Sequence, residues 1–87
     1  MPDTTVNDTK IKVYSTTWCG DCRMAKRWFD SHGIAYEDIN VEQDKQAEEA
    51  MLKVNGGRWV VPTIVLADGS ILTEPSAREL AEKFPQQ

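Results

Sequence analysis

Polar and hydrophobic positions alternate along two stretches of this chain and give way to a continuous apolar run in a third. The alternation over residues 10–15 and 34–41 predicts two half-buried strands. The run over 59–67 is typical of a central strand covered on both faces. Asp68-Gly69 is a strong hairpin signal, so a fourth strand is expected over 70–73.

Between and after these stretches, apolar residues recur with the period of a helix. The predicted helices cover about 20–32, about 43–54 and the segment behind Ser76. Gly33 and Asn55-Gly56-Gly57 supply the first two stops, and Ser76 with Glu79 forms a capping box. The side chains expected in the core are Cys22, Ala25, Trp28 and Phe29, then Ala47, Ala50, Met51 and Val54, and finally Ala77, Leu80, Ala81 and Phe84.

The predicted order is β-α-β-α-β-β-α, with helices on both faces of a four-stranded sheet. We expect the strands joined through helices to run parallel and the final hairpin to add an antiparallel edge. Residues 1–9 have the polar composition of a flexible lead-in, and no repeat or linker divides the rest. The 87 residues therefore predict one α/β domain over 1–87.

Composition narrows the range of functions. The net charge of -4 lacks the basic excess that nucleic acid or an anionic membrane attracts, so neither is an expected partner. The first residues lack the apolar core of a signal peptide, and no run approaches the ~20 apolar residues of a membrane span. We expect a cytoplasmic protein, and in that compartment a cysteine pair is more often catalytic or redox-sensing than structural.

Both cysteines lie in Cys19-Gly20-Asp21-Cys22, at the predicted junction of the first strand and the first helix. Unpaired N–H groups and the helix dipole at this point favour a thiolate, the reactive form of cysteine. Cys19, ahead of the helix, is the expected low-pKa nucleophile, and Cys22 is expected to be covered and more thiol-like. Zinc is the main structural alternative, but His32 and carboxylates are the only other ligands.

The Cys-x-x-Cys at this junction and Val61-Pro62 ahead of a later strand resemble the glutaredoxin family over about residues 10–84. The resemblance implies a thioredoxin fold in its minimal glutaredoxin-like form, with a four-stranded mixed sheet. Glutathione-dependent members usually carry a lysine, Pro-Tyr and Gly-Gly-(Cys/Ser)-Asp where this chain has Thr16, Gly20-Asp21 and Thr73-Glu74-Pro75-Ser76. These departures point away from glutathione as the small-thiol partner.

The chain is similar in more detail to mycoredoxins, the glutaredoxin-like proteins that use mycothiol. The similarity is carried by Thr16-Thr17-Trp18-Cys19-Gly20-x-Cys22, Val54-Asn55-Gly56-Gly57, Val61-Pro62-Thr63 and Ala67-Asp68-Gly69-Ser70-x-Leu72-Thr73. It implies that Cys19 attacks a mixed disulfide and takes the small thiol onto itself. It also implies that the Val61–Pro62 bond is cis and lies beside the active-site disulfide.

Five residues are candidates for substrate binding. A cis Pro62 shapes the turn and leaves the N–H and C=O of Val61 free to pair with an extended thiol ligand. Trp18 either shapes the docking surface or packs on the sheet. Arg58 and Trp59 precede this turn, and the guanidinium there either holds a carboxylate or sugar hydroxyl of the small thiol or is that of an ordinary surface arginine.

The remaining polar residues near the motif have simpler interpretations. Asp21 is either a solvated turn residue or a proton relay to Cys22. The basic residues of the first helix form a solvated face, and His32 complements the dipole at the end of that helix. These basic residues are Arg23, Lys26 and Arg27.

The sequence therefore predicts a monomeric thiol–disulfide oxidoreductase that needs no bound cofactor or metal. Its expected co-substrate is a low-molecular-weight thiol: mycothiol, bacillithiol or, less in keeping with the motifs, glutathione. Its expected partners are proteins that carry mixed disulfides, together with a flavin disulfide reductase. Two alternatives stay open. One is a ribonucleotide-reductase electron donor recharged by thioredoxin reductase; the other is an iron–sulfur carrier in which Cys19 of two subunits and two small thiols hold a 2Fe–2S cluster.

Overall fold

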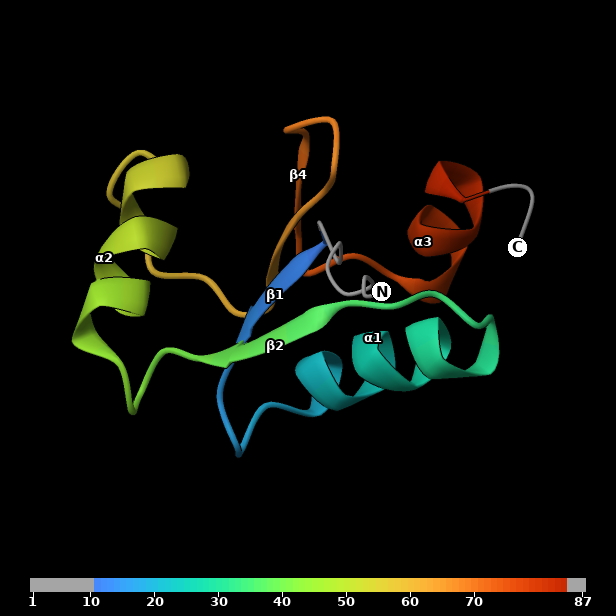
Figure 1. Ribbon diagram of the computed structural model, residues 1–87, viewed down its shortest axis with the longest axis horizontal. Coiled ribbons are helices and arrows are strands. Elements are labelled where there is room, and N and C mark those ends of the chain that lie inside the picture. Colours follow the sequence, from blue (N-terminus) through green and yellow to red (C-terminus); the bar gives the residue numbers. More distant parts are fainter. Residues whose placement is uncertain (1–10, 85–87) are drawn as a thin grey trace, which may run out of the picture.

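The computed structural model describes residues 11–84, which form strands and helices in the predicted order. The strands are β1 (Lys12–Ser15), β2 (Glu37–Asn40), β3 (Thr63–Val65) and β4 (Ile71–Thr73), and the helices are α1 (Gly20–Ser31), α2 (Lys45–Val54) and α3 (Ala77–Lys83) (Figure 1). The lead-in predicted over 1–9, and Lys10 of the first predicted strand, lie outside the described residues.

The strands form one mixed sheet in the order β2-β1-β3-β4. β1 and β2 are parallel, whereas β3 is antiparallel to both β1 and β4. The antiparallel edge hairpin is confirmed, but the prediction that β3 runs parallel to the first two strands is wrong. Helix α2 does not return the chain to the start of β1: the carbonyl oxygen of Val61, just ahead of β3, lies 3.8 Å from Sγ of Cys19, just beyond β1. Strand β3 therefore begins where β1 ends.

Strand β3 is also shorter than the apolar run over 59–67. Val61 and Pro62 are buried in the turn ahead of the strand, and Pro62 has no N–H to offer a neighbouring strand. The hydroxyl of Thr63 donates to the carbonyl oxygen of Val60 at 2.7 Å and closes this turn. Val61 and Pro62 are therefore apolar because the turn is buried, and not because they pair in the sheet.

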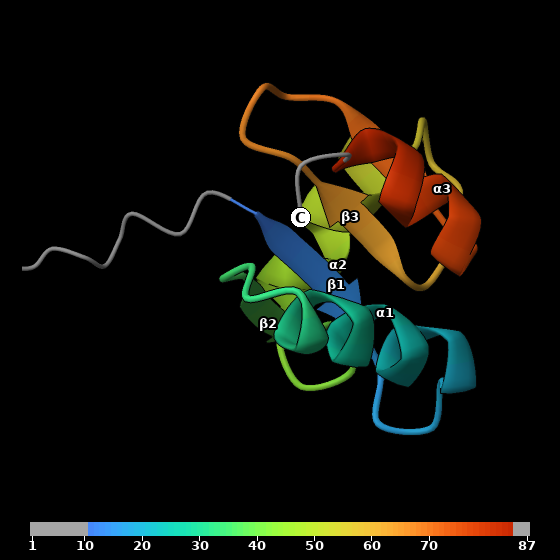
Figure 2. The same cartoon turned by 90° about the vertical axis from the view of Figure 1, so that its right-hand side faces the viewer.

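Two hydrophobic cores lie on opposite faces of the sheet, because successive side chains of β1 point to opposite sides. One core contains Val13, Ala25, Phe29, Ile64, Leu66 and Leu80. The other contains Tyr14, Cys19, Cys22, Val41, Met51 and Val61. Figure 2 shows α1 and α3 in front of the strands and α2 behind them, as predicted. Both cysteines therefore pack in the core beneath α2.

The predicted helix ends are confirmed. In α1, the N–H groups of Gly33 and Ile34 donate to the carbonyls of Asp30 and Phe29, and Gly33 has the left-handed φ of 69° that this stop requires. At the start of α3, the Ser76 hydroxyl accepts from the Glu79 N–H at 3.1 Å, and the Glu79 carboxylate accepts from the Ser76 N–H at 2.8 Å. This is the predicted capping box.

Burial differs from the prediction at three helix positions. Val54, the last residue of α2, is 41% exposed, and Ala77 and Ala81 are exposed as well. Helix α3 has only two turns, so its contact with the core reduces to Leu80, which is fully buried, and the half-buried Phe84.

The hairpin predicted at Asp68-Gly69 is confirmed, with a loop over residues 66–70 between β3 and β4. The Asp68 carboxylate accepts hydrogen bonds from the N–H of Ser70 at 2.9 Å and from its hydroxyl at 2.6 Å. These bonds hold the pKa of Asp68 below its ordinary value. Gly69 adopts a φ of 90°, which only glycine takes without strain.

Candidate active site

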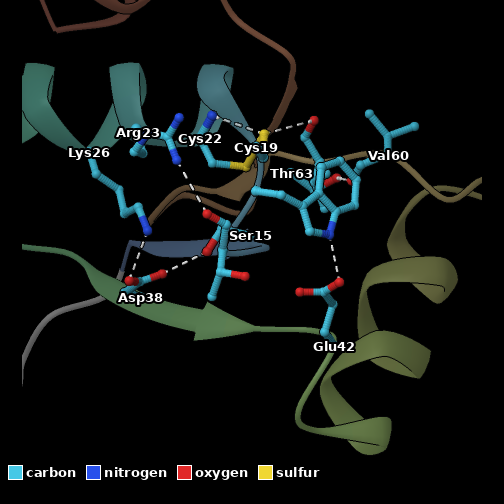
Figure 3. Close-up of a disulfide and its surroundings, with 12 residues drawn as sticks. Ser15, Cys19, Cys22, Arg23, Lys26, Asp38, Glu42, Val60 and Thr63 are labelled. Atoms are coloured by element: carbon cyan, nitrogen blue, oxygen red, sulfur yellow. Dashed lines mark hydrogen bonds and ion pairs between the residues drawn. A yellow bond between two sulfur atoms is a disulfide. The ribbon is translucent and has the colours of Figure 1, made fainter.

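A disulfide joins Cys19 and Cys22 at the start of α1, with 5.2 Å between the two Cα atoms (Figure 3). Cys19 is the N-cap residue of the helix and has extended backbone angles, whereas Cys22 lies in the first turn. Cys19 is 7% exposed and Cys22 is fully buried. An attacking disulfide or thiol can therefore reach only the Cys19 sulfur, in line with the order predicted for the two cysteines.

Two backbone groups contact the Cys19 sulfur. The N–H of Cys22 donates to Sγ at 3.0 Å, and the carbonyl oxygen of Val61 lies 3.8 Å away on the other side. A sulfur at the N-cap meets the unpaired N–H groups and the positive end of the helix dipole, and both favour the thiolate once the disulfide is reduced.

The Val61–Pro62 peptide bond is cis, and it lies beside the disulfide as the family resemblance implies. Side chains from two directions hold this turn in place. The Asn55 amide donates to the hydroxyl of Thr63 at 2.9 Å, and that hydroxyl donates on to Val60. The sequence marked Asn55 as the end of α2 and as part of a motif shared with mycoredoxins, but it did not indicate this contact, because a contact between residues eight positions apart leaves no periodic signal.

The segment that replaces the glycines of glutathione-dependent relatives lies against the same turn. The Glu74 N–H donates to the carbonyl oxygen of Pro62 at 3.0 Å. Glu74 has a φ of 48°, a left-handed conformation that is uncommon for a residue with a side chain. The backbone thus keeps a conformation that suits glycine, while the side chain adds a carboxylate.

The two tryptophans beside the motif are exposed and stack on each other. Trp18 is 61% exposed and Trp59 is 43% exposed, and their ring centroids lie 6.2 Å apart with an interplanar angle of 14°. The Trp18 indole N–H donates to Glu42 at 2.6 Å (Figure 3), and that of Trp59 donates to Glu48 at 2.9 Å. Trp18 therefore does not pack on the sheet, and neither glutamate was among the residues that the sequence singled out.

The other predicted positions are spread around this centre. Arg58 and Asp21 are exposed, and His32 lies at the far end of α1 with its Nδ1 atom 2.8 Å from the Trp28 carbonyl oxygen. Thr16, which stands in place of the family lysine, is 2% exposed. Within the described part of the chain its hydroxyl has no hydrogen-bond partner.

Two of the three basic residues of α1 hold the site together. Arg23 donates to the carbonyl oxygen of Thr17 at 3.2 Å and so ties the helix to the loop ahead of Cys19. Lys26 and the buried Ser15 converge on Asp38 of β2, at 3.0 and 2.8 Å (Figure 3). The interpretation of these residues as a solvated face is therefore incomplete, because helical spacing does not reveal contacts with β1 and β2.

Replacing Asp38 with alanine should lower the free energy of unfolding by about 1–3 kcal/mol, because the buried Ser15 hydroxyl loses its acceptor. The ion pair adds little, since the Asp38 side chain is 49% exposed. Urea unfolding of the disulfide form measures the loss.

Asp38→Asn is the matched control, because its amide oxygen still accepts from Ser15 while the charge is gone. This variant should lower the free energy of unfolding by less than about 1 kcal/mol, the usual range for an exposed ion pair. Equal losses in the two variants would assign the stabilisation to Lys26 and contradict this account.

Comparisons with known proteins agree with this geometry. The glutaredoxin family model matches residues 11–71. A candidate glutaredoxin of Mycobacterium tuberculosis is 42% identical over 74 residues, which cover 85% of this chain and 88% of the relative. Mycoredoxin 1 of Corynebacterium glutamicum is 37% identical over 76 residues, 87% of this chain and 94% of the relative. The glutaredoxin-like protein NrdH of Lactococcus lactis is 32% identical over 58 residues, 67% of this chain and 78% of the relative.

Solved structures share the architecture. The crystal structure of a thioredoxin-like protein superposes with a TM-score of 0.74 at 27% identity, over 84% of this chain and 97% of that chain. Across residues 11–84, no helix combines the length and apolar character needed to cross a bilayer, and no three His, Cys, Asp or Glu side chains are grouped to hold a metal ion. The matching family model, the relatives and the Cys19–Cys22 pair at the start of α1 together show that this chain belongs to the glutaredoxin family and is a thiol–disulfide oxidoreductase.

Proposed function

We propose that this protein reduces mixed disulfides between protein cysteines and a low-molecular-weight thiol of the mycothiol type. The Cys19 thiolate attacks the sulfur of the small thiol, the protein thiolate leaves, and Cys19 carries the small thiol as a new disulfide. A second molecule of the small thiol attacks that disulfide and frees Cys19. The two joined small thiols leave together, and a flavin disulfide reductase returns them to the reduced pool.

The observation that carries this proposal is the unequal access to the two sulfurs. Cys19 is 7% exposed and accepts a backbone hydrogen bond, whereas Cys22 is fully buried. A cycle through a mixed disulfide on Cys19 needs only the accessible sulfur. Mycoredoxin 1, similar over 87% of this chain, supports mycothiol as the thiol, as does the loss of the lysine and glycines seen in glutathione-dependent relatives.

Five residues surround the place where the mixed disulfide binds in this proposal. The Val61 backbone pairs with the extended substrate, and Pro62 fixes the direction of that backbone. The other three, which offer ring faces and a guanidinium, are Trp18, Trp59 and Arg58. The protein acts as a monomer in the cytoplasm, where reducing thiol pools hold cysteines in the thiol form.

A parallel assay tests the choice of thiol. One protein substrate is loaded in turn with mycothiol, bacillithiol or glutathione, and the rate of release is measured with the matching thiol and its reductase. Release of mycothiol at least about tenfold faster than release of glutathione, a difference of about 1.4 kcal/mol in the barrier, is the expected result. Equal rates, or a preference for glutathione, would contradict the proposed thiol.

A second function has support from a specific relative. NrdH of Lactococcus lactis is 32% identical to this chain over 58 residues. In this second function the protein is an electron donor in which Cys19 and Cys22 cycle together and thioredoxin reductase restores the dithiol. NADPH consumption by thioredoxin reductase in the presence of the oxidised protein would favour this second function. Recharging by the small thiol alone favours the first.

A further inference from the structure

The stacked pair of Trp18 and Trp59 is a large aromatic surface that the fold leaves open beside the nucleophile. Trp18 directly precedes Cys19, and Trp59 lies in the segment that leads into the Val61–Pro62 turn. The two residues are 61% and 43% exposed, although tryptophan has the largest side chain of any amino acid. Exposed aromatic rings at the rim of a reactive centre typically mark a surface that binds a partner.

Both indole N–H groups are already used. Each tryptophan has a single donor, and Glu42 and Glu48 accept them at 2.6 and 2.9 Å. A ligand therefore meets ring faces and carboxylates and no free indole donor. Within residues 11–84, neither glutamate has a cationic side chain within ion-pair distance. Two uncompensated negative charges thus lie against the edges of the rings.

This arrangement suits a positively charged group. A lysine or arginine over an indole face is attracted by the electrons of the ring, and nearby carboxylates add to that attraction. An anionic group is repelled by the same two carboxylates. The surface is therefore expected to prefer cationic groups over anionic ones, which hydrophobic contact alone would not do.

The negative charge extends from these two glutamates along the start of α2. The segment from Glu42 to Glu49, which covers the turn after β2 and the first half of α2, holds four carboxylates against one lysine. The carboxylates are Glu42, Asp44, Glu48 and Glu49. Residues 44–49 alone span about 8 Å of helix axis. A basic segment of a protein substrate is complementary in charge to this acidic stretch.

We infer that Trp18, Trp59, Glu42 and Glu48 form a docking surface for a lysine or arginine side chain that flanks the disulfide-bonded cysteine of a protein substrate. The inference rests on the proposed function, since it concerns the protein half of the mixed disulfide. The two glutamates are positioning residues here: they orient the indole rings and supply the charge, and they do not contact the reacting sulfur.

The test uses one cysteine peptide in three versions, with lysine, glutamine or glutamate beside the cysteine, each joined to 2-mercaptoethanol as a mixed disulfide. The full-length protein should reduce the lysine version with a kcat/KM about tenfold above that of the glutamate version, with glutamine between them. The ratio should shrink toward one as salt rises from about 0.1 M to about 1 M, because the Debye length falls from ~10 Å to ~3 Å.

The decisive variant is Glu42→Gln with Glu48→Gln, which keeps an oxygen to accept each indole N–H and removes both charges. Its lysine-to-glutamate ratio should drop to about two or less. Glu37→Gln with Glu82→Gln is the matched control. It removes the same net charge at exposed positions on the far end of β2 and on α3, and the ratio should not change.

Three results would overturn the inference: equal rates for the three peptides, an equal fall of the ratio in the control, or a ranking that follows the small thiol. The last is checked by joining the glutamine peptide to cysteamine or to 3-mercaptopropionate. Binding to the disulfide form, measured by tryptophan fluorescence with cysteine-to-serine peptides, separates this inference from the proposed function. If the peptides bind in the order lysine, glutamine, glutamate but are not reduced, only the proposed function is contradicted. If they are reduced at rates that do not depend on their charge, only the docking surface is contradicted.

Discussion

Replacing Cys19 with serine should abolish thiol–disulfide exchange, with a loss of at least about a thousandfold on every disulfide substrate. The serine hydroxyl stays protonated near neutral pH, and it forms no disulfide to carry the small thiol. Serine is the informative replacement because Cys19 is the N-cap of α1 and its sulfur accepts from the Cys22 N–H at 3.0 Å. A serine oxygen caps the same N–H, so the fold should survive.

The measurement is release of a labelled small thiol from a protein mixed disulfide, with circular dichroism and thermal unfolding of the same sample. Cys19→Ala serves as the contrast: it removes both the nucleophile and the cap, which costs about 0.5–2 kcal/mol of stability. We expect both variants to be inactive and only the alanine variant to be destabilised by loss of the cap. Turnover by a folded serine variant would refute Cys19 as the nucleophile.

The sequence predicted those parts of the fold that depend on local signals. Gly33 and the Ser76–Glu79 capping box act within a few residues, so they mark helix ends without knowledge of the rest of the chain. The direction of β3 depends instead on where α2 delivers the chain. Periodicity carries no information about that path, and the crossover rule gives only the handedness of a connection between strands that are already known to be parallel.

The candidate site divides in the same way. Cys19 and Cys22 were identified because a Cys-x-x-Cys at a strand-to-helix junction is a local pattern. Glu42 and Glu48 were missed because the bonds that give them a role cross 24 and 11 residues of sequence. Exposed glutamates are common in any sequence, and only the indole N–H groups that they accept distinguish these two. The stacking of Trp18 on Trp59 is likewise a property of two loops that meet in space.

Replacing Cys22 with serine should separate two reactions that the wild-type protein performs. The rate at which the variant releases a small thiol from a mixed disulfide should stay within about threefold of the wild-type rate, since that cycle needs only one attacking sulfur. Reduction of a disulfide within a protein should be lost, because the complex trapped on Cys19 then has no second thiol to resolve it. The hydrogen bond that supports the Cys19 sulfur comes from the backbone N–H of residue 22, so the substitution leaves it in place.

The two activities are measured side by side, on a glutathionylated or mycothiolated protein and on insulin disulfides. Cys22 is fully buried, and a serine hydroxyl there costs about 1–3 kcal/mol when it finds no partner, so thermal unfolding of the variant is the necessary control. At a temperature where the variant is folded, loss of both activities together would show that Cys22 acts in the main cycle. The dithiol electron donor would then replace the mixed-disulfide reductase as the better account, because only that cycle requires Cys22 to attack the disulfide on Cys19 at every turnover.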